Sequence, residues 1–597
     1  MKLKPLLFLI PAACLASCSL KQVIENVFTP SSANNYDTDP VETIKTDTSS
    51  TSYDKELEEE VVEVPEDFTG ENTTAITTDG NYSFEGEIGP IDIKKGIEVY
   101  LFFNSVTINN DAGVAISSGK DSKVHIVLQN GSTNTVTNNF EDTNAIHLKG
   151  ELYISGQGIL NIESKQKTGL KVSGDIFISG ENVILNVTGA NHAINGRSIT
   201  VNKSTVNVVS KGKDGIQLEC DEVIEFTNEQ GFAYFVDANL TADTVGDGIQ
   251  AASYVYISGG ETSITTHGEF ISYSTTNMST YGLETDDFKF IKSGSTYKRV
   301  SKDEIKTLNS SYYAFAQSVK GIKVGAIEDS SGNDIITGDY EISIAHLANV
   351  AIKSYDDCIH TNYGKVSLDS CNLELDSMDD GVHADYDLLI SNASVHITSS
   401  YEGLEGANVT ISGENTNIIS YSSDDGINAA SDLVSQTNIT INDGYLRIYA
   451  NGDGVDANTG LYFKGGTTIV EGPGSGNGSL DSDKIYFQGG IVFACSTSGM
   501  TESMTATQCT FAYQGSTMAT NKLISITDSS NNSLFSYTLK QSCNQLIFSH
   551  PSLQVGSSYN IMSDSSKITT ISMTSTLTKV GISGGGPGGG GGAGWGH

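Results

Sequence analysis

Between residues 78 and about 450, apolar and polar residues alternate in short runs. Two examples are the runs 388–397 and 438–448, in which β-branched and other apolar residues take every second position until Asn, Gly or Ser interrupts them. Alternation bounded by turn residues predicts a strand, a tight bend and a second strand. Because successive side chains point to opposite faces of a strand, one face of each run is expected to be buried.

One short phrase recurs five times between residues 354 and 458. Each copy ends in an acidic or polar pair, a small residue that is usually glycine, and an apolar residue. The apolar members are Ile359, Val382, Leu404, Ile427 and Val455, at steps of 23, 22, 23 and 28 residues. A nearly fixed period of this size predicts a solenoid, because one coil cannot bury its apolar face alone and must stack on its neighbours.

Weaker copies of the phrase lie upstream, at steps of 24, 24, 22 and 33 residues. Their apolar members are Ile146, Leu170, Ile194, Ile216 and Ile249, and Ile322 belongs to a further copy. Coils of about 22 residues with three short strands predict a parallel β-helix, and the pattern of a leucine-rich repeat is not seen. We expect one all-β domain over residues 79–483, with about a dozen coils stacked about 4.8 Å apart into a rod roughly 55 Å long.

Two segments depart from this rhythm. Residues 268–317 form an insertion, in which 288–300 predicts a hairpin and Ser301 with Glu304 predicts a capped short helix. The period then fades, and residues 484–575 predict a small antiparallel β cap, which the end of a solenoid needs.

Residues 1–18 predict a lipoprotein-type signal peptide. Two early lysines precede the apolar run 6–16, which is too short to span a bilayer. We expect Cys18 to be the lipidated first residue of the mature chain; Cys14, or simple cleavage by a general signal peptidase, are the alternatives. The acidic, Ser- and Thr-rich residues 19–78 predict a disordered stalk. The protein is therefore expected to be exported and lipid-anchored to the outer surface of the cell envelope.

The charge of the chain narrows its possible partners. A formal net charge of -38 and a pI of about 4.4 argue against nucleic acid or anionic lipid. No other stretch is apolar enough to cross a membrane, so we expect membrane contact through the lipid anchor only. We also expect the protein to be a monomer.

The cysteines show no CxxC metal spacing; Cys495 and Cys509 either pair across a hairpin or stay buried free thiols. Residues 576–597 form a glycine-rich tail, which is almost all glycine from Gly584 on, and are expected to be disordered.

The repeated phrases carry paired carboxylates. Equivalent positions in successive coils lie about 4.8 Å apart, and two carboxylates at that distance repel by roughly 3–4 kcal/mol at an effective dielectric constant near 20. A single Asp-Gly is turn chemistry, but the second aspartate adds nothing that a turn requires. Calcium, which prefers six to eight oxygen ligands, would relieve the repulsion. The predicted ligands are Asp356, Asp357, Asp379, Asp380, Asp385, Glu402, Glu405, Asp424, Asp425, Asp453 and Asp456.

The phrases DDGVHAD, YEGLEG, SDDGINAA and NGDGVDANTG resemble the calcium-binding carbohydrate-binding domain family. The resemblance spans roughly residues 81–561 and is most specific over 320–481. It implies the right-handed parallel β-helix of pectate lyases, calcium ligation by the acidic pairs, and binding of cellulose and acidic pectic glycans without cleavage.

Three functions compete on this basis. The first is calcium-dependent, non-catalytic binding of plant-type polysaccharides such as cellulose and polygalacturonate outside the cell. The second is a calcium-dependent pectate lyase, which needs a Lys or Arg base beside the metal. The candidate bases are Lys320, Lys323, Lys353 and Arg447, each more simply explained as a solvated solenoid residue. The third is a cell-surface adhesin. We favour the first, because no Lys/Arg signature accompanies the acidic residues.

Tyrosines are the aromatic candidates for sugar stacking, because the only tryptophan, Trp595, lies in the glycine-rich tail. The candidates recur about once per coil, and an aromatic ladder of the solenoid explains them equally well; they are Tyr355, Tyr363, Tyr386, Tyr401 and Tyr421. Because an acidic chain repels uronates, polygalacturonate is expected to bind through calcium. Cellulose is expected to depend more on the tyrosines.

Overall fold

The computed structural model describes residues 62–219, 230–278, 280–308, 310–325, 336, 340–473, 477–497 and 503–582, all of which belong to one unit, Thr43–His597. The predicted signal peptide, the lipidation site Cys18, Cys220, residues 19–61 of the predicted stalk and residues 583–597 of the tail lie outside the described residues. Residues 70–71, 75–76 and 577–580 are strands, so the expectation of disorder is wrong for these parts of the stalk and the tail. Within these ranges, no helix is both long and apolar enough to cross a membrane.

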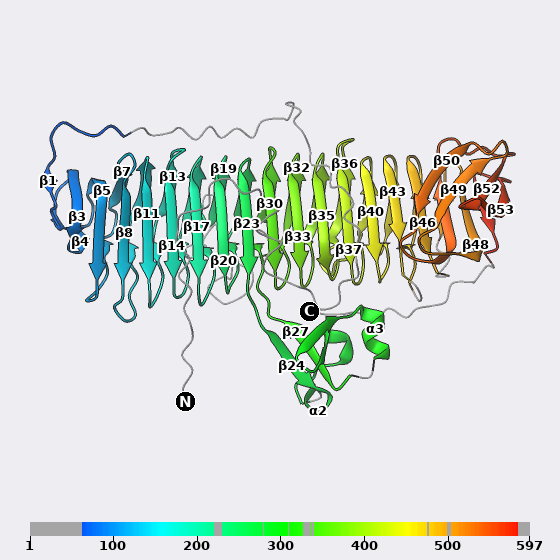
Figure 1. Ribbon diagram of the computed structural model, residues 1–597, viewed down its shortest axis with the longest axis horizontal. Coiled ribbons are helices and arrows are strands. Elements are labelled where there is room, and N and C mark those ends of the chain that lie inside the picture. The colour runs from blue at the N-terminus through cyan, green and yellow to red at the C-terminus, as the bar shows by residue number, and fades with distance from the viewer. Residues whose placement is uncertain are drawn as a thin grey trace. The chain divides into compact units, whose positions relative to one another are not determined.

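The described residues form an all-β solenoid of about 16 turns, so the predicted parallel β-helix is confirmed (Figure 1). It has more turns than the dozen expected from the repeats. The additional coils lie before Ile146 and after Val455, where strands still pair in parallel although the phrase is absent. These strands alternate buried and outward residues as the other coils do. Alternation alone is a weaker signal in a sequence than a repeated phrase, so these coils were not predicted.

Successive coils pair along three parallel ladders, named here A, B and C. Ladder A contains β2 (Ala75–Ile76), β4 (Ile91–Ile93), β6 (Ile116–Ser118), β9 (Ile146–Leu148), β12 (Leu170–Val172), β15 (Ile194–Gly196), β18 (Ile216–Leu218), β21 (Ile249–Ala251), β28 (Ile322–Val324), β31 (Ile359–Thr361), the starts of β34 (Val382–Ser391) and β36 (Leu404–Ser412), β38 (Ile427–Ala429), β41 (Val455–Ala457) and β44 (Leu480–Ser482).

Ladder B contains β1 (Gly70–Glu71), β3 (Gly80–Ile88), β5 (Glu98–Asn110), β7 (Lys123–Leu128), β10 (Glu151–Gly156), β13 (Asp175–Ser179), β16 (Ser198–Asn202), β19 (Phe232–Val236), β22 (Tyr254–Ser258), β29 (Tyr340–Ala345), β32 (Gly364–Asp369), the ends of β34 and β36, β39 (Asn438–Ile441), β42 (Gly460–Phe463), β45 (Ile485–Phe487) and β47 (Met504–Ala506). Ladder C contains the end of β5, β8 (Thr133–Asn138), β11 (Ile159–Ser164), β14 (Ile184–Gly189), β17 (Thr205–Ser210), β20 (Asn239–Thr244), β23 (Glu261–Thr266), β30 (Asn349–Ser354), β33 (Asn372–Ser377), β35 (Ser394–Ser400), β37 (Asn417–Ser422), β40 (Tyr445–Ala450), β43 (Thr467–Glu471) and β46 (Ile491–Ser496).

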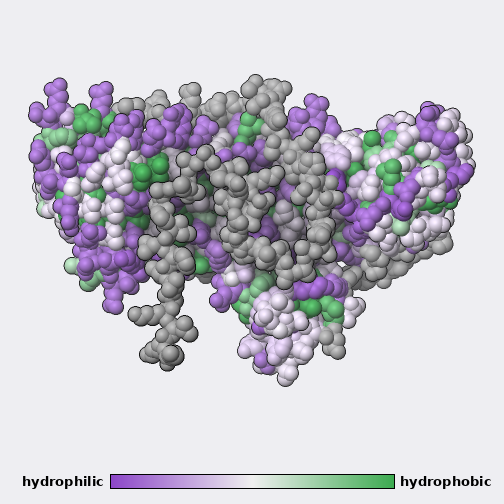
Figure 2. Space-filling view, in the orientation of Figure 1, coloured by the Kyte–Doolittle hydropathy of each residue, from purple (hydrophilic) through white to green (hydrophobic). Residues whose placement is uncertain are grey.

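Ladder A holds the repeated phrases in register. The five apolar residues of the strong copies pair with one another in sequence order and are fully buried. The glycine before them permits this close stacking: a Cβ atom at Gly403 would lie 2.3 Å from the carbonyl oxygen of Gly426 in the next coil. Outward positions are largely hydrophilic on the face shown in Figure 2. The core is therefore a continuous column of stacked apolar side chains inside the coils.

The insertion forms a small four-stranded antiparallel sheet beside the solenoid (Figure 1). Its elements are β24 (Phe270–Ser274), α2 (Thr275–Met278), η1 (Thr285–Asp287), β25 (Phe290–Ser293), β26 (Thr296–Arg299), α3 (Lys302–Thr307) and β27 (Tyr312–Ala316). The predicted hairpin is β25 with β26, and the predicted helix is α3, in which the Ser301 side chain accepts a hydrogen bond from the Glu304 N–H at 3.2 Å. Phe288, Ile305 and Tyr313 form its own small core.

A predominantly antiparallel assembly closes the C-terminal end, as predicted. The last ladder C strand, β46, pairs antiparallel with β51 (Cys543–Ser549), which also pairs with β48 (Thr510–Met518). β54 (Leu577–Val580) adds to β48 in parallel. The remaining sheet has the order β50 (Ser533–Thr538), β49 (Leu523–Asp528), β52 (Ser558–Ser563) and β53 (Ser566–Ser572). Cys495 and Cys509 are both free thiols, so they do not form the disulfide that was one of the two alternatives.

Candidate functional site

A row of mostly acidic residues crosses the coils directly before the glycine position; it is named here the pre-glycine row. Its members include Asp214, Asp247, Lys320, Asp357, Asp380, Glu402, Asp425 and Asp453. Five of these carboxylates accept a hydrogen bond from the backbone N–H of the next member, at 2.5–3.2 Å. The second aspartate of the phrase thus satisfies a backbone donor of the neighbouring coil. The second aspartate, which a turn does not require, therefore has a structural role in the stacking of the coils.

Lys320 neutralises the first acidic pair. Its Nζ atom lies 2.6 Å from Asp356 Oδ2 and 2.6 Å from Asp357 Oδ2, and all three side chains are buried. The Ser318 hydroxyl donates to Asp356 at 2.6 Å. Burial alone would lower the pKa of Lys320, but the two carboxylates raise it well above its usual value. Lys320 is therefore a protonated amine at neutral pH, held where a metal ion was expected.

The insertion contributes a second amine. Lys289 Nζ forms an ion pair with Asp379 and lies 4.5 Å from the ring centroid of Tyr401. Although burial opposes it, Asp379 and Asp380 raise the pKa of Lys289 well above its usual range. Lys320 and Lys289 thus compensate three of the predicted calcium ligands, Asp356, Asp357 and Asp379. Tyr401, a predicted sugar contact, lies beneath this lysine and is buried.

The insertion has two further contacts with the acidic coils. Arg299 donates to the Ser399 hydroxyl at 3.1 Å and to the Ser377 carbonyl. The backbone N–H of Lys302, the first residue of α3, donates to Asp424 Oδ2 at 3.3 Å. These contacts join residues 78 to 122 positions apart in the chain, so local sequence patterns carried no signal for them.

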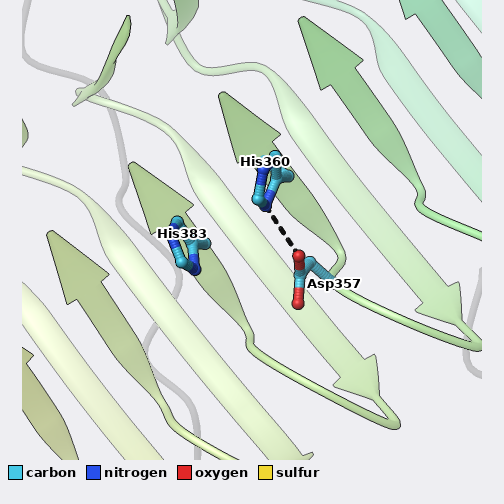
Figure 3. A group of neighbouring side chains, drawn as sticks. All are labelled: Asp357, His360 and His383. Carbon is cyan, nitrogen blue, oxygen red and sulfur yellow. Dashed lines mark hydrogen bonds and ion pairs between the residues drawn. The ribbon is translucent and has the colours of Figure 1, made fainter. Parts of the chain in front are cut away.

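Two histidines occupy the middle position of successive ladder A strands (Figure 3). His360 Nδ1 lies 2.7 Å from Asp357 Oδ2, and the ring centroids of His360 and His383 are 4.6 Å apart. Lys320 and His360 hold the pKa of Asp357 well below its usual value against the effect of burial. These histidines were missed as site residues, although their shared place directly after the repeated apolar residue was a usable signal.

His383 lies among three carboxylates. Its Nδ1 atom is 3.1 Å from Asp380 Oδ2 and 3.1 Å from Glu405 Oε2, and its Nε2 atom is 3.3 Å from Asp385 Oδ1. Burial would lower the pKa of His383, but Glu405 and the two aspartates raise it well above its usual value. Three groups bring ligand atoms within 4.8 Å of one another: Asp357, His360 and His383; Asp380, His383 and Glu405; and Asp356, Asp357 and Asp379. Each of these groups could hold a metal.

The C-terminal acidic coils have a different environment. Among the described residues, no Lys, Arg or His nitrogen lies within 4.0 Å of Asp425 or Asp453. Burial, then Asp424 and Asp456, raise the pKa of Asp425 well above its usual value. Burial and the nearby carboxylates of Asp481 and Asp456 outweigh a backbone hydrogen bond and raise the pKa of Asp453 to about 8. This group is rich in carboxyl oxygens, and within the described ranges Asp425 and Asp453 have no ion pair of the kind that Lys320 forms with Asp357.

Glu402 lies between these environments. Its Oε2 atom accepts a hydrogen bond from Asn428 Nδ2 at 2.8 Å, and burial and Glu405 raise its pKa well above its usual value. The structure thus brings the predicted ligands onto one side of adjacent coils, in three environments: the lysine-paired first coils, the histidine-centred middle and the C-terminal coils that hold Asp425 and Asp453.

The other predicted tyrosines do not form one surface. The ring centroid of Tyr355 lies 5.6 Å from that of Phe270 in the insertion, and the ring of Tyr421 stacks on that of Tyr449 in ladder C, with 4.6 Å between their centroids. The Tyr363 N–H donates to Asp385 Oδ2 at 2.8 Å at the turn from ladder A to ladder B, and Tyr386 follows Asp385 in β34. The tyrosines therefore lie on several sides of the coils.

The candidate lyase bases are also separated. Lys353 pairs with Asp376 at 2.8 Å, and an Arg447 guanidinium nitrogen lies 2.6 Å from the Tyr449 hydroxyl in ladder C. Lys323 lies in ladder A, in register with His360. Of the four candidates, Lys320 and Lys323 come from the coil that precedes the histidine-centred group.

The chain matches a family described as carbohydrate-binding domain-containing protein over residues 70–381, 316–477 and 370–530. A carbohydrate-binding domain-containing protein from Acetivibrio thermocellus is 29% identical over 127 residues, which cover 19% of this chain and 44% of that relative. The solved structure of a polysaccharide lyase-like protein from C. thermocellum, a gadolinium derivative, is 22% identical, with a TM-score of 0.27; the match covers 32% of this chain and 82% of that one.

Proposed function

Because the chain belongs to the carbohydrate-binding domain family, we propose that it is a calcium-dependent polysaccharide-binding protein that does not cleave its ligand. Its proposed ligands are polygalacturonate and cellulose. We also propose that a lipid on Cys18 anchors it to the outer surface of the cell envelope, as the signal-like sequence suggests.

The observation that carries the calcium proposal is the crowding of Asp425 and Asp453. Both accept backbone N–H groups, and both have pKa values raised by burial and by neighbouring carboxylates. An all-oxygen donor set suits calcium, which accepts carboxylates and carbonyl groups in flexible geometry. We therefore place the calcium ligands at Asp424, Asp425, Asp453 and Asp456. When bound there, calcium would supply a positive charge and coordination positions for a sugar carboxylate.

The earlier acidic coils suit calcium less well. The amines of Lys320 and Lys289 already lie beside Asp356, Asp357 and Asp379. Further along, the His383 imidazole occupies the space between Asp380 and Glu405, and it offers nitrogen ligands that calcium does not favour. The proposed ligand set is therefore smaller than the sequence suggested.

The geometry of Lys320 weighs against a lyase. A general base must be unprotonated near neutral pH, whereas Asp356 and Asp357 at 2.6 Å keep the Lys320 amine charged. Lys353 is likewise held in an ion pair with Asp376. These contacts support binding without bond cleavage as the activity.

A glycan array tests the proposal. The secreted-form protein would be applied in calcium and again with a chelator, and polygalacturonate solutions would be followed for the ultraviolet absorbance of an unsaturated uronide. We expect strong calcium-dependent binding to polygalacturonate, weaker dependence for cellulose, and no new absorbance. Calcium-dependent absorbance would instead make the protein a lyase, and binding to no glycan would remove carbohydrate as its ligand.

A further inference from the structure

A basic recess lies far along the coils from the acidic groups. It has a volume of about 680 Å³ and lies where ladder A turns into ladder B, across the loops that follow β6, β9, β12 and β15. The cationic and imidazole side chains that line it are Lys120, Lys123, Lys149, Arg197 and His147, with Asp121 and Glu151 as its acidic members. Such a cluster is unusual in a chain with a net charge of -38.

The floor of the recess is backbone. A Cβ atom at Gly150 would lie 1.9 Å from the carbonyl oxygen of Ser122, and one at Gly174 would lie 2.6 Å from that of Gly150. The stacking of the coils therefore excludes a side chain at these two positions. Longer basic side chains stand around an open floor, which leaves room for a ligand of sugar size.

Two of the lysines are available to an external anion. Lys123 pairs with Glu151 at 3.4 Å, and Arg197 pairs bidentately with Asp175. Among the described residues, Lys120 and Lys149 have no carboxylate within 4.0 Å, and both are exposed. The recess therefore contains positive charge that the protein itself does not neutralise.

The pKa of His147 reflects the positive charge of the lysines around the recess. Burial lowers its pKa, and Lys171, Lys149 and Lys167 lower it further. His147 and Lys171 are neighbours in the middle row of ladder A, the row that ends in Asp456 and Asp481 at the other end of the solenoid. The row therefore carries His147 and Lys171 in the coils of the recess and two aspartates near its C-terminal end, so the negative net charge does not describe the coils around the recess.

We propose that this recess binds the carboxylate of a uronic acid residue in an anionic polysaccharide directly, through Lys120 and Lys149, without a metal ion. The proposal rests on the proposed carbohydrate-binding function and adds a second contact to it. An ammonium group binds a carboxylate by charge-assisted hydrogen bonds, and its attraction acts over about 8 Å at physiological salt. Calcium at the acidic coils and lysines at the basic coils would then hold separate stretches of one chain.

The test compares Lys120→Gln/Lys149→Gln with the control Lys567→Gln/Lys579→Gln, which removes the same charge from exposed positions of the cap. Binding of a galacturonate oligosaccharide is measured by calorimetry in a chelator, with a neutral oligosaccharide of equal length and inorganic phosphate as further probes. We expect the first variant to bind the galacturonate roughly tenfold more weakly, as two charge-assisted contacts are lost. The control should bind as the wild type does. Unchanged thermal unfolding midpoints would show that both variants fold.

The outcomes separate this inference from the proposed function. Equal binding by both variants, or no wild-type binding in chelator while binding in calcium persists, would overturn the lysine contact alone. Phosphate that competes as strongly as the uronate at equal concentration would make the recess a general anion site and overturn the sugar assignment. A wild type that binds no polysaccharide in either condition would overturn both proposals.

Discussion

The Asp357 carboxylate accepts a hydrogen bond from the backbone N–H of Asp380, one coil further along, at 2.9 Å between Oδ1 and N. The same oxygen-to-amide contact recurs between other members of the pre-glycine row. An acidic residue at this position therefore has a structural role before any role in binding, because it satisfies a donor that stacking buries.

This role predicts different effects for two substitutions of Asp247, which lies outside the proposed metal site. Asp247 Oδ1 accepts the Lys320 N–H at 2.7 Å, and the side chain is buried. Asp247→Ala leaves that donor without its acceptor and should lower the free energy of unfolding by about 1–3 kcal/mol. Asp247→Asn keeps an acceptor oxygen and should cost less. Chemical denaturation in chelator measures both; an equal loss in the two variants would contradict the acceptor role.

Asp247 should also make stability depend on pH. Burial raises its pKa from 3.8 to about 6. A carboxyl group with a raised folded-state pKa stabilises the fold fully below its unfolded pKa, and this contribution is lost as the pH rises through the folded value. Relative to Asp247→Asn, the wild type should therefore lose roughly 3 kcal/mol between about pH 4 and pH 6. Denaturation curves of the two proteins across this range provide the measurement; parallel pH profiles would contradict the assignment.

Lys320 should be far more important to stability than an exposed lysine. Lys320→Met leaves Asp356 and Asp357 buried together without their amine and should cost about 3–5 kcal/mol. The control Lys353→Met breaks a half-exposed pair with Asp376 and should cost about 1 kcal/mol or less. Calcium should recover more stability in Lys320→Met than in the wild type. Thermal unfolding with and without calcium measures this, and similar losses in the two variants would refute the central role of Lys320.

The solenoid was predictable because its signal is repeated. Alternation and a period near 23 residues specify parallel coils, and the register of Ile359 with Val382 follows directly from the phrase. The number of coils was less accessible, since the first and last coils keep alternation but lack the phrase. The insertion's hairpin and the Ser301 cap were predictable from local patterns, which need no knowledge of the partner surface.

The candidate site was only partly predictable. The acidic residues were found, but their compensation by Lys289 depends on a contact across 90 positions of sequence. The role of the pre-glycine carboxylates as backbone acceptors could not be predicted either, because it depends on which backbone N–H of the next coil has no partner in the ladders. His360 and His383 stand at equivalent positions in two phrases, and each pairs with the aspartate three residues before it, Asp357 or Asp380, so this spacing was visible within a single phrase.

The Lys289 contact should hold the insertion in place. Lys289→Gln removes the ion pair with Asp379 and the cation over the Tyr401 ring. Because the side chain is half-exposed, we expect a loss of about 1 kcal/mol, seen as roughly fivefold faster amide hydrogen exchange in β25 and β26. The control Lys298→Gln, which breaks an exposed pair with Glu304 inside the insertion, should leave those rates nearly unchanged. Equal rates in both variants would show that the insertion is held by other contacts.

Calcium titration of Asp425→Asn/Asp453→Asn tests the central claim most directly. Asparagine keeps an oxygen for the backbone donors while removing the charges, and Glu66→Gln/Asp67→Asn removes two exposed charges as the matched control. The account predicts that wild type and control bind calcium in calorimetry and then bind polygalacturonate at least about tenfold more tightly than in chelator, whereas the Asp425/Asp453 variant gains neither. Equal calcium binding by all three proteins, or wild-type affinity for polygalacturonate that calcium does not change, would contradict it.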